Sequence, residues 1–311
     1  MVLTLLCQHS DGATLWAGCY SIAAKGGSLD VFIRQFLEDR PEPVALWFGQ
    51  SDGFEDEAKL HQAEELLEGG EGARVVAALC TRLPKGVDLS RVALMPLDDT
   101  FFVQGVVPAL RLSESPPWQT RLPQLFWCGR GCGHRPWHVA RLATSPHAVL
   151  GFTDLVPAGS PLARSWAHAP EYQKYKYVAI IDGNVIASSL MWSFALGCVP
   201  VLLTHPRNRY WFQHHLVPYE NYIPLRWDLQ DYEGTIEWLR SHDAECERIA
   251  ANARHLAETL FSAEGQRAYV EGELARALEG RPVPAINPCQ DGYLSMQKCE
   301  AGGRPGQSEL E

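Results

Sequence analysis

Short apolar runs alternate with polar segments along this chain, and the clearest succession of them lies between residues 172 and 203. Residues 175–181 are crowded with β-branched and aromatic side chains and predict a buried strand. Apolar residues then recur at helical spacing over residues 186–196, and Gly197 stands where such a helix would stop. Residues 199–203 form a second apolar run of strand length. Strand, helix and strand in this order predict a βαβ unit and therefore a parallel sheet.

The same kind of pattern predicts further elements on both sides of this unit. The other predicted strands are residues 2–6, 44–48, 74–80, 91–95, 125–127 and 222–225. The other predicted helices are residues 20–25, 29–37, 52–71, 207–216 and 246–260, with one more after the 125–127 strand and one that Asp231 would cap. Strands that alternate with helices in this way indicate an α/β fold.

Proline and glycine content predicts where the chain divides. Residues 108–123 contain four prolines among polar residues, which is typical of a connection between domains. We therefore expect an N-terminal α/β domain over residues 1–123 and a second α/β domain over residues 124–279. From residue 280 to residue 311, Pro, Gly and polar residues dominate and predict a mobile tail.

The overall composition excludes some partners and favours one location. The net charge of −10 argues against nucleic acid, because phosphate binding needs a basic face. No apolar run reaches the length of a membrane span, and the opening residues lack the basic region and cleavage site of a secretory signal. Nine scattered cysteines are expected to be free thiols, which predicts a reducing compartment and a cytoplasmic location. Peripheral association with a membrane surface stays open.

Two turns carry the candidate chemistry, because ligands of open parallel sheets bind beyond the carboxyl ends of the strands. Asp182, Gly183 and Asn184 directly follow the 175–181 strand, and we expect them at the ligand. The start of the following helix would there face a diphosphate or a ribose. In the alternative interpretation, Asp182 only caps that helix.

The second turn is the glycine-rich segment CGRGCGH, residues 128–134. Gly129, Gly131 and Gly133 would let backbone amides approach a diphosphate, and Arg130 offers a fork of donors. The alternative is a tight turn between a strand and a helix. The basic and imidazole side chains expected to be solvated, paired at the surface or structural are Arg135, Arg141, His134, His138 and His205.

The order of these motifs resembles one known family. KYKY, a strand, DGN, a helix, a small-residue turn and a strand are followed by YWF and NYIPLRWDLQD. This succession, over residues 172–260 and more weakly back to residue 94, resembles glycosyltransferase family 90. That family includes protein O-glucosyltransferases, fungal capsule xylosyltransferases and lipopolysaccharide-type transferases of bacteria or viruses. The resemblance implies two Rossmann-like lobes in a GT-B arrangement, with an acceptor-side lobe, a nucleotide-sugar lobe and a cleft between them.

The resemblance also implies an activity. It implies transfer of glucose or xylose from a UDP-sugar to a glycan or lipopolysaccharide-like acceptor, with inversion. Members of the family work without metal and the chain contains no Asp-x-Asp motif, so we expect no metal and no cofactor besides the donor. The family's general base corresponds to Asp99 or Asp98, of which we choose Asp99; adjacent negative charges would raise the pKa of one of them, which suits a base. Asp154 resembles a family residue near the base or the sugar.

Two positions depart from the family pattern. Cys128 stands where the family's loop usually has arginine, so either Arg130 takes over its role or the loop is shifted by two residues. Ser189 stands where many members have arginine, with Arg207 and Arg209 as candidate substitutes. These departures motivate the alternative of a degenerate member that binds a nucleotide sugar or glycan without turnover. A dinucleotide oxidoreductase is a weaker alternative, because no G-x-G-x-x-G follows an early strand.

Overall fold

The computed structural model describes residues 3–8, 14–17, 44–49, 74–79, 92–94 and 115–281, except residues 185, 188, 206, 207 and 209. These residues fall into two compact units. The first contains the N-terminal strands, residues 208 and 210–213, and residues 263–281; the second contains residues 115–205 and 214–262. Some predictions lie outside the described residues and are not tested by them. They are the helices predicted before residue 72, the candidate base residues Asp98 and Asp99, and the predicted tail beyond residue 281.

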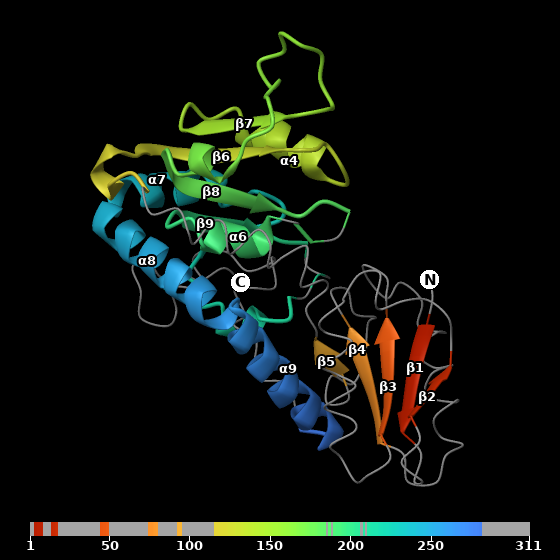
Figure 1. The fold of residues 1–311 in the computed structure, drawn as a ribbon. Helices are drawn as coiled ribbons and strands as arrows, with labels where there is room; N and C mark the ends of the chain where they lie inside the picture. The colour runs from red at the N-terminus through yellow and green to blue at the C-terminus, as the bar shows by residue number, and fades with distance from the viewer. Residues whose placement is uncertain are drawn as a thin grey trace, which may run out of the picture. The chain divides into compact units, whose positions relative to one another are not determined.

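The first unit contains a five-stranded mixed sheet (Figure 1). Its strand order is β2 (Thr14–Ala17), β1 (Leu3–Gln8), β3 (Val44–Gly49), β4 (Arg74–Leu79) and β5 (Val92–Leu94). Strand β1 is antiparallel to β2 and β3, whereas β3, β4 and β5 are parallel. Helix α9 (Ala263–Leu278) packs against β4 and β5. The four strands predicted in this region are confirmed, whereas the sequence pattern predicts neither β2 nor α9.

The second unit contains a five-stranded sheet in which every strand is parallel to its neighbours, as the βαβ pattern predicts. Its order is β10 (Ile223–Leu225), β9 (Val199–Leu203), β8 (Tyr175–Ile181), β6 (Leu122–Gly129) and β7 (Ala148–Phe152) (Figure 1). A 3-10 turn (Trp118–Thr120) precedes β6, and the short helix α5 (Ala169–Tyr172) precedes β8.

The order of strands in this sheet fixes where a ligand is expected. Counted from β7, the strands come second, first, third, fourth and fifth in the chain, which is a doubly wound order. Helix α4 (Arg135–Leu142) leads from β6 to β7, and α6 (Leu190–Phe194) leads from β8 to β9. The winding direction therefore reverses between β6 and β8. Open α/β sheets bind ligands outside the carboxyl ends of the strands at such a point.

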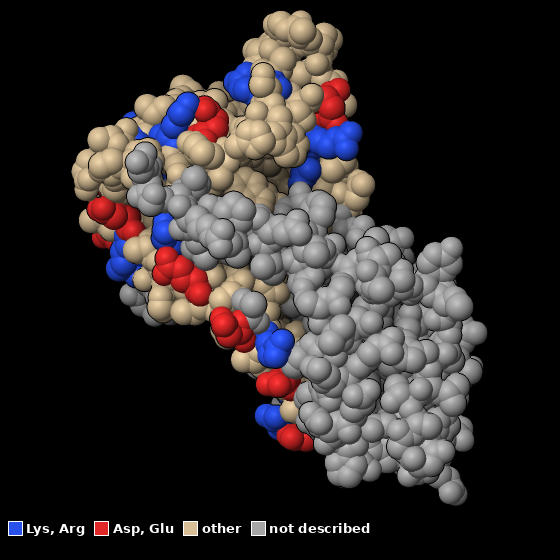
Figure 2. Space-filling view, viewed as in Figure 1, with Lys and Arg blue, Asp and Glu red and all other residues tan. Residues whose placement is uncertain are grey.

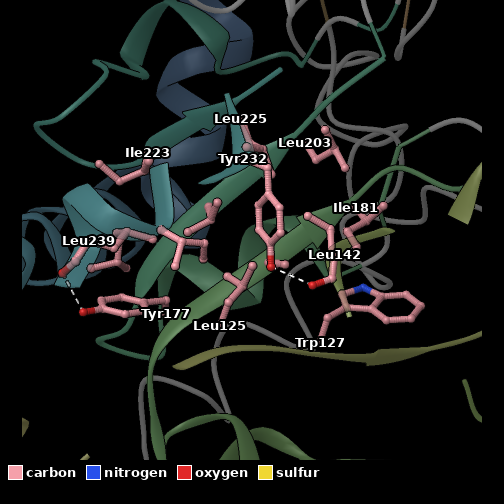
Figure 3. Packing of buried hydrophobic residues seen from close by; sticks show 14 of the residues in the cluster. Leu125, Trp127, Leu142, Tyr177, Ile181, Leu203, Ile223, Leu225, Tyr232 and Leu239 are labelled. Carbon is pink, nitrogen blue, oxygen red and sulfur yellow. Dashed lines mark hydrogen bonds between the residues drawn. The ribbon is translucent and has the colours of Figure 1, made fainter. Parts of the chain in front are cut away.

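Two buried tyrosines join the sheet to one helix and that helix to a second one (Figure 3). Tyr177 of β8 donates its hydroxyl proton to Leu239 O of α7 (Tyr232–Ser241), 2.7 Å away. Tyr232 at the start of α7 donates to Leu142 O at the end of α4, 2.6 Å away. An unpartnered buried hydroxyl costs about 1–3 kcal/mol, so these bonds allow both rings to be fully buried. They tie α4 and α7 to the core of the second unit.

Helix α8 (Asp243–Leu260) covers β9 and α6. Its buried positions are Cys246, Ile249, Ala250, Ala253 and Ala257. This spacing of three and four residues confirms the amphipathic helix predicted over residues 246–260.

Two predicted helices are shorter than expected. Helix α6 covers residues 190–194 instead of 186–196, because the buried carboxylate of Asp182 accepts a hydrogen bond from the amide of Ala187 at 3.2 Å. This bond holds the preceding residues in a turn. The predicted helix over residues 207–216 is replaced, in its described part, by a single 3-10 turn (Gln213–His215).

Asp231 does not cap α7, so that prediction is wrong. It occupies the N-cap position, but no hydrogen bond runs from its side chain to the helix. Both carboxylate oxygens instead accept from the amide of Arg226, at 3.1 and 3.2 Å. Burial raises the pKa of this carboxyl group to about 6. The carboxylate therefore closes the turn between β10 and α7.

The charged residues of the second unit are of both signs on the face shown in Figure 2, where basic and acidic side chains are interspersed. Within the described ranges, no helix is long and apolar enough to cross a membrane. The same ranges contain no group of three or more His, Cys, Asp or Glu side chains arranged to hold a metal ion.

Candidate functional site

The turns that follow β6 and β8 touch each other at the reversal point of the sheet. Gly133 has a left-handed φ of +57°, and a Cβ placed on it would lie 2.5 Å from the carbonyl carbon of Gly183 and closer still to its oxygen. A Cβ on Gly183 would lie 2.8 Å from the sulfur of Cys132. Real Cβ atoms do not approach backbone atoms this closely, so glycine is required at position 133, whereas a Cβ at position 183 would force the sulfur of Cys132 to shift. The structure thus brings together the two turns singled out in the sequence.

Arg135 links the two turns through its side chain. Its Nε and Nη2 donate to Ile181 O at the end of β8, at 3.0 and 2.9 Å. Its Nη1 donates to Arg130 O and to the sulfur of Cys132, both at 3.3 Å. The expectation that Arg135 is solvated or paired at the surface is therefore wrong. Its position is set by contacts between residues that are far apart in the chain, which no local pattern reveals.

The N-terminus of α4 presents unbonded donors beside this guanidinium group. Within the described part of the chain, the amides of Gly133 and His134 donate to no acceptor. The first amides of a helix have no intrahelical partner, and the helix dipole adds partial positive charge there. Arg135 and the exposed Arg130 add positive charge in the same segment of the chain. This end of α4 is therefore suited to binding an anion.

Asp154 shapes the same loop from the end of β7. One oxygen accepts from the amide of Gly131 at 2.9 Å, and the other accepts from Arg130 Nε at 3.1 Å. These contacts hold the pKa of the Asp154 carboxyl below its ordinary value, and the hydrogen bond from the Gly131 amide has the largest effect. The Gly131 amide, which we expect to approach a diphosphate, is thus occupied by a carboxylate in this structure. A bound diphosphate would have to compete with Asp154.

Asp182 is fully buried, with its carboxylate engaged by backbone amides. It accepts from Ala187 N at 3.2 Å and from His205 N at 3.0 Å. The bond from His205 connects the turn after β8 to the segment that follows β9. Asp182 therefore supports the shape of this edge of the sheet, while Asn184, in the same turn, is exposed.

The remaining candidate residues take different positions. Gly129 is the last residue of β6 rather than part of the loop. Ser189 is the N-cap residue of α6, and its hydroxyl makes no hydrogen bond with any described residue. Cys128 is buried and donates to Ser165 O at 3.1 Å, and burial raises the pKa of its thiol. It supplies no positive charge in place of the arginine usual at that position. Arg207 and Arg209 lie outside the described residues.

Comparison with known proteins places the chain. The model for glycosyl transferase family 90 matches residues 108–271, more than half of the chain. The chain is 29% identical over 239 residues to protein O-glucosyltransferase 2 of Danio rerio, which covers 74% of this chain and 41% of that protein. It is 26% identical over 142 residues to the O-glucosyltransferase LpsA of Dichelobacter nodosus, covering 44% of each.

A viral relative is similar over a shorter stretch. Uncharacterized protein 027R of Frog virus 3 is 35% identical over 135 residues, 42% of this chain and 12% of that protein. The chain thus spans less than half the length of each of these three relatives. The sequence motifs, the doubly wound parallel sheet and the match over residues 108–271 lead to one assignment: this chain belongs to glycosyltransferase family 90.

Proposed function

We propose that this protein is a metal-independent, inverting glycosyltransferase. It moves a sugar, glucose or xylose, from a UDP-sugar to a glycan or lipopolysaccharide-like acceptor. Membership of the family supports transfer of a sugar, and the names of the Danio rerio and Dichelobacter nodosus relatives favour glucose. The missing Asp-x-Asp motif supports stabilisation of the diphosphate without a metal.

One observation carries the proposal. The turns after β6 and β8 meet at Gly133 and Gly183, the amides of Gly133 and His134 at the start of α4 donate to no acceptor among the described residues, and Arg135 is fixed at the junction. A diphosphate leaving group carries the charge that develops in the transfer. Donors that are already in place can stabilise that charge without reorganising, which is the largest contribution in many enzymes.

The reaction follows from these parts. The acceptor hydroxyl oxygen attacks the anomeric carbon, the bond from that carbon to the diphosphate oxygen breaks, and UDP leaves with the electron pair. A carboxylate takes the acceptor proton, and Asp99 or its neighbour Asp98 is proposed for this role. The GT-B arrangement, with the acceptor held by the N-terminal lobe, belongs to the same proposal. So does a cytoplasmic location, which rests on the scattered cysteines.

Calorimetric titration with UDP tests the binding part of the proposal. A charge-assisted contact contributes about 1.5–3 kcal/mol, so Arg130→Ala should weaken UDP binding about ten- to a hundredfold. Arg141→Ala is the matched control, because it removes an exposed arginine from the opposite end of α4. Equal affinity of both variants and the wild type for UDP would assign Arg130 a purely local role in the turn.

Mass spectrometry of donor hydrolysis and transfer, over a panel of UDP- and GDP-sugars, tests the activity. The proposal expects turnover with UDP-glucose or UDP-xylose, and loss of about 10²–10⁴-fold in Asp99→Asn with UDP affinity retained. Full turnover in both the Asp99→Asn and Asp98→Asn variants would exclude this pair as the base.

A second candidate function is binding of a nucleotide sugar without turnover. The observation that favours it is the pairing of Asp154 with the Gly131 amide, together with a buried, uncharged Cys128 where the family has arginine. A carboxylate beside the loop opposes a diphosphate, so charge compensation is weaker than in the family pattern. UDP binding with neither transfer nor donor hydrolysis would establish this second function.

A further inference from the structure

Beside the two turns, three histidines surround one tryptophan, and we call this group the His–Trp cluster. The ring of Trp227 lies with its centroid 4.2 Å from His138, 5.0 Å from His205 and 5.4 Å from His134. The rings of His134 and His205 are 6.1 Å apart and nearly parallel, with 23° between their planes.

The cluster is assembled at the same edge of the sheet as the candidate site. His134 precedes α4, His205 follows β9, and Trp227 follows β10. His134 adjoins Gly133, which touches the turn after β8, and the amide of His205 donates to Asp182 of that turn. Both connections are direct, so the position of the rings is coupled to the position of the turns.

One member of the cluster, His138, is buried and contacts the backbone of two others. His138 is 1% exposed, and its ring nitrogens lie 3.0 Å from His134 O and 2.9 Å from Trp227 O. These contacts hold the backbone of His134 and Trp227, two of the other three members of the cluster. By contrast, His134 is exposed, and His205 and Trp227 are partly exposed. The cluster therefore has a fixed base and aromatic rings that reach the surface.

We infer that His134, His205 and Trp227 form the stacking surface for the pyrimidine base of UDP, an inference that rests on the proposed function. A nucleobase is a flat π system, and aromatic side chains bind it by stacking. The base of a nucleotide must lie within the length of one ribose of the diphosphate. His134 meets this condition, because its own amide is one of the two unbonded donors at the start of α4.

The test compares the affinities of UDP and of inorganic pyrophosphate, measured by calorimetry. His134→Ala should weaken UDP about five- to a hundredfold, the range expected for one base–aromatic stack, and leave pyrophosphate affinity unchanged. His134→Phe should retain UDP affinity, because it keeps an aromatic ring without imidazole hydrogen bonds. Trp166→Ala is the control, since it removes an exposed aromatic ring that makes none of the described ring contacts with the cluster.

The outcomes separate this inference from the proposed function. If wild-type protein binds no UDP, the proposed function fails. If wild-type protein binds UDP and His134→Ala binds it equally well, the stacking surface is refuted and the proposed function stands. A parallel loss of UDP and pyrophosphate in His134→Ala, or no recovery in His134→Phe, would also overturn stacking, because the imidazole would then act on the phosphates.

Discussion

Replacing Gly133 by alanine tests the contact on which the site is built. The substitution has two costs that can be separated. Gly133 has φ +57°, and a left-handed conformation costs an alanine about 1–2 kcal/mol. The added Cβ would also lie 2.5 Å from the carbonyl carbon of Gly183, so the turns must separate by about 1 Å to reach the 3.4–4 Å of ordinary contact.

Gly197→Ala is a matched control for the first cost. Gly197 has φ +67°, and the nearest atom to its Cβ would be a nitrogen of Arg121 at 3.8 Å, which is an ordinary contact. Gly197→Ala should therefore lose about 1–2 kcal/mol of unfolding free energy, measured by chemical denaturation, and Gly133→Ala should lose more, because the close contact adds its own cost. Gly133→Ala alone should disturb the turns.

The functional difference between the two variants is the informative quantity. Misplacement of a reacting group by about 1 Å costs about a hundredfold in rate, so Gly133→Ala should lose about that factor in sugar transfer or donor hydrolysis. Its UDP affinity should fall as well, whereas Gly197→Ala should retain both. If Gly133→Ala matches the control in turnover and UDP affinity, the contact between the turns is irrelevant to function and the reasoning is refuted.

Three further predictions concern charge. Burial raises the pKa of Asp231 in the folded state to about 6, so its protonated form stabilises the fold below about pH 4, and this stabilisation is lost as the pH rises through 6. The Asp231→Asn side chain does not ionise, so the unfolding free energy of the variant relative to the wild type should be larger at about pH 7 than at about pH 4. An equal difference at both pH values would contradict this. Asp154→Asn keeps an acceptor for the Gly131 amide but removes a negative charge beside the loop. The variant should therefore bind UDP about two- to fivefold more tightly than the wild type at low salt. Weaker binding would mean that Asp154 contacts the donor. Transfer should survive EDTA, and activity that vanishes with EDTA and returns with manganese would refute metal independence.

Strand β8 was predictable because its signal is local, whereas β6 was predicted for only three of its eight residues. The run of β-branched and aromatic residues over 175–181 is buried along its whole length, so its boundaries in the sequence and in the structure agree. The end of the helical segment is also local in part: Gly197 takes the predicted left-handed conformation, although α6 itself already ends at Phe194. Its start was not predictable, because it depends on Asp182 bonding to Ala187 and to His205, which lies beyond the next strand.

The assembly of the site depends on strand order, which periodicity does not contain. The sequence identifies both turns, but only the pairing of β6 with β8 brings Gly133 against Gly183. The same holds for Arg135, whose acceptors lie at the ends of both strands. The His–Trp cluster is scattered over nearly a hundred residues, so its members read separately as structural histidines. Strand β7 is also missed, because Gly151 interrupts its short apolar run.

The most direct test of the central claim is a crystal structure of the protein with UDP bound. The claim is that the diphosphate lies at the carboxyl ends of β6 and β8, at the start of α4. The account predicts phosphate oxygens within hydrogen-bond distance of the amides of Gly133 and His134 and of the Arg130 side chain. UDP bound with its phosphates at any other edge of this sheet, and with these donors still unbonded, would contradict it.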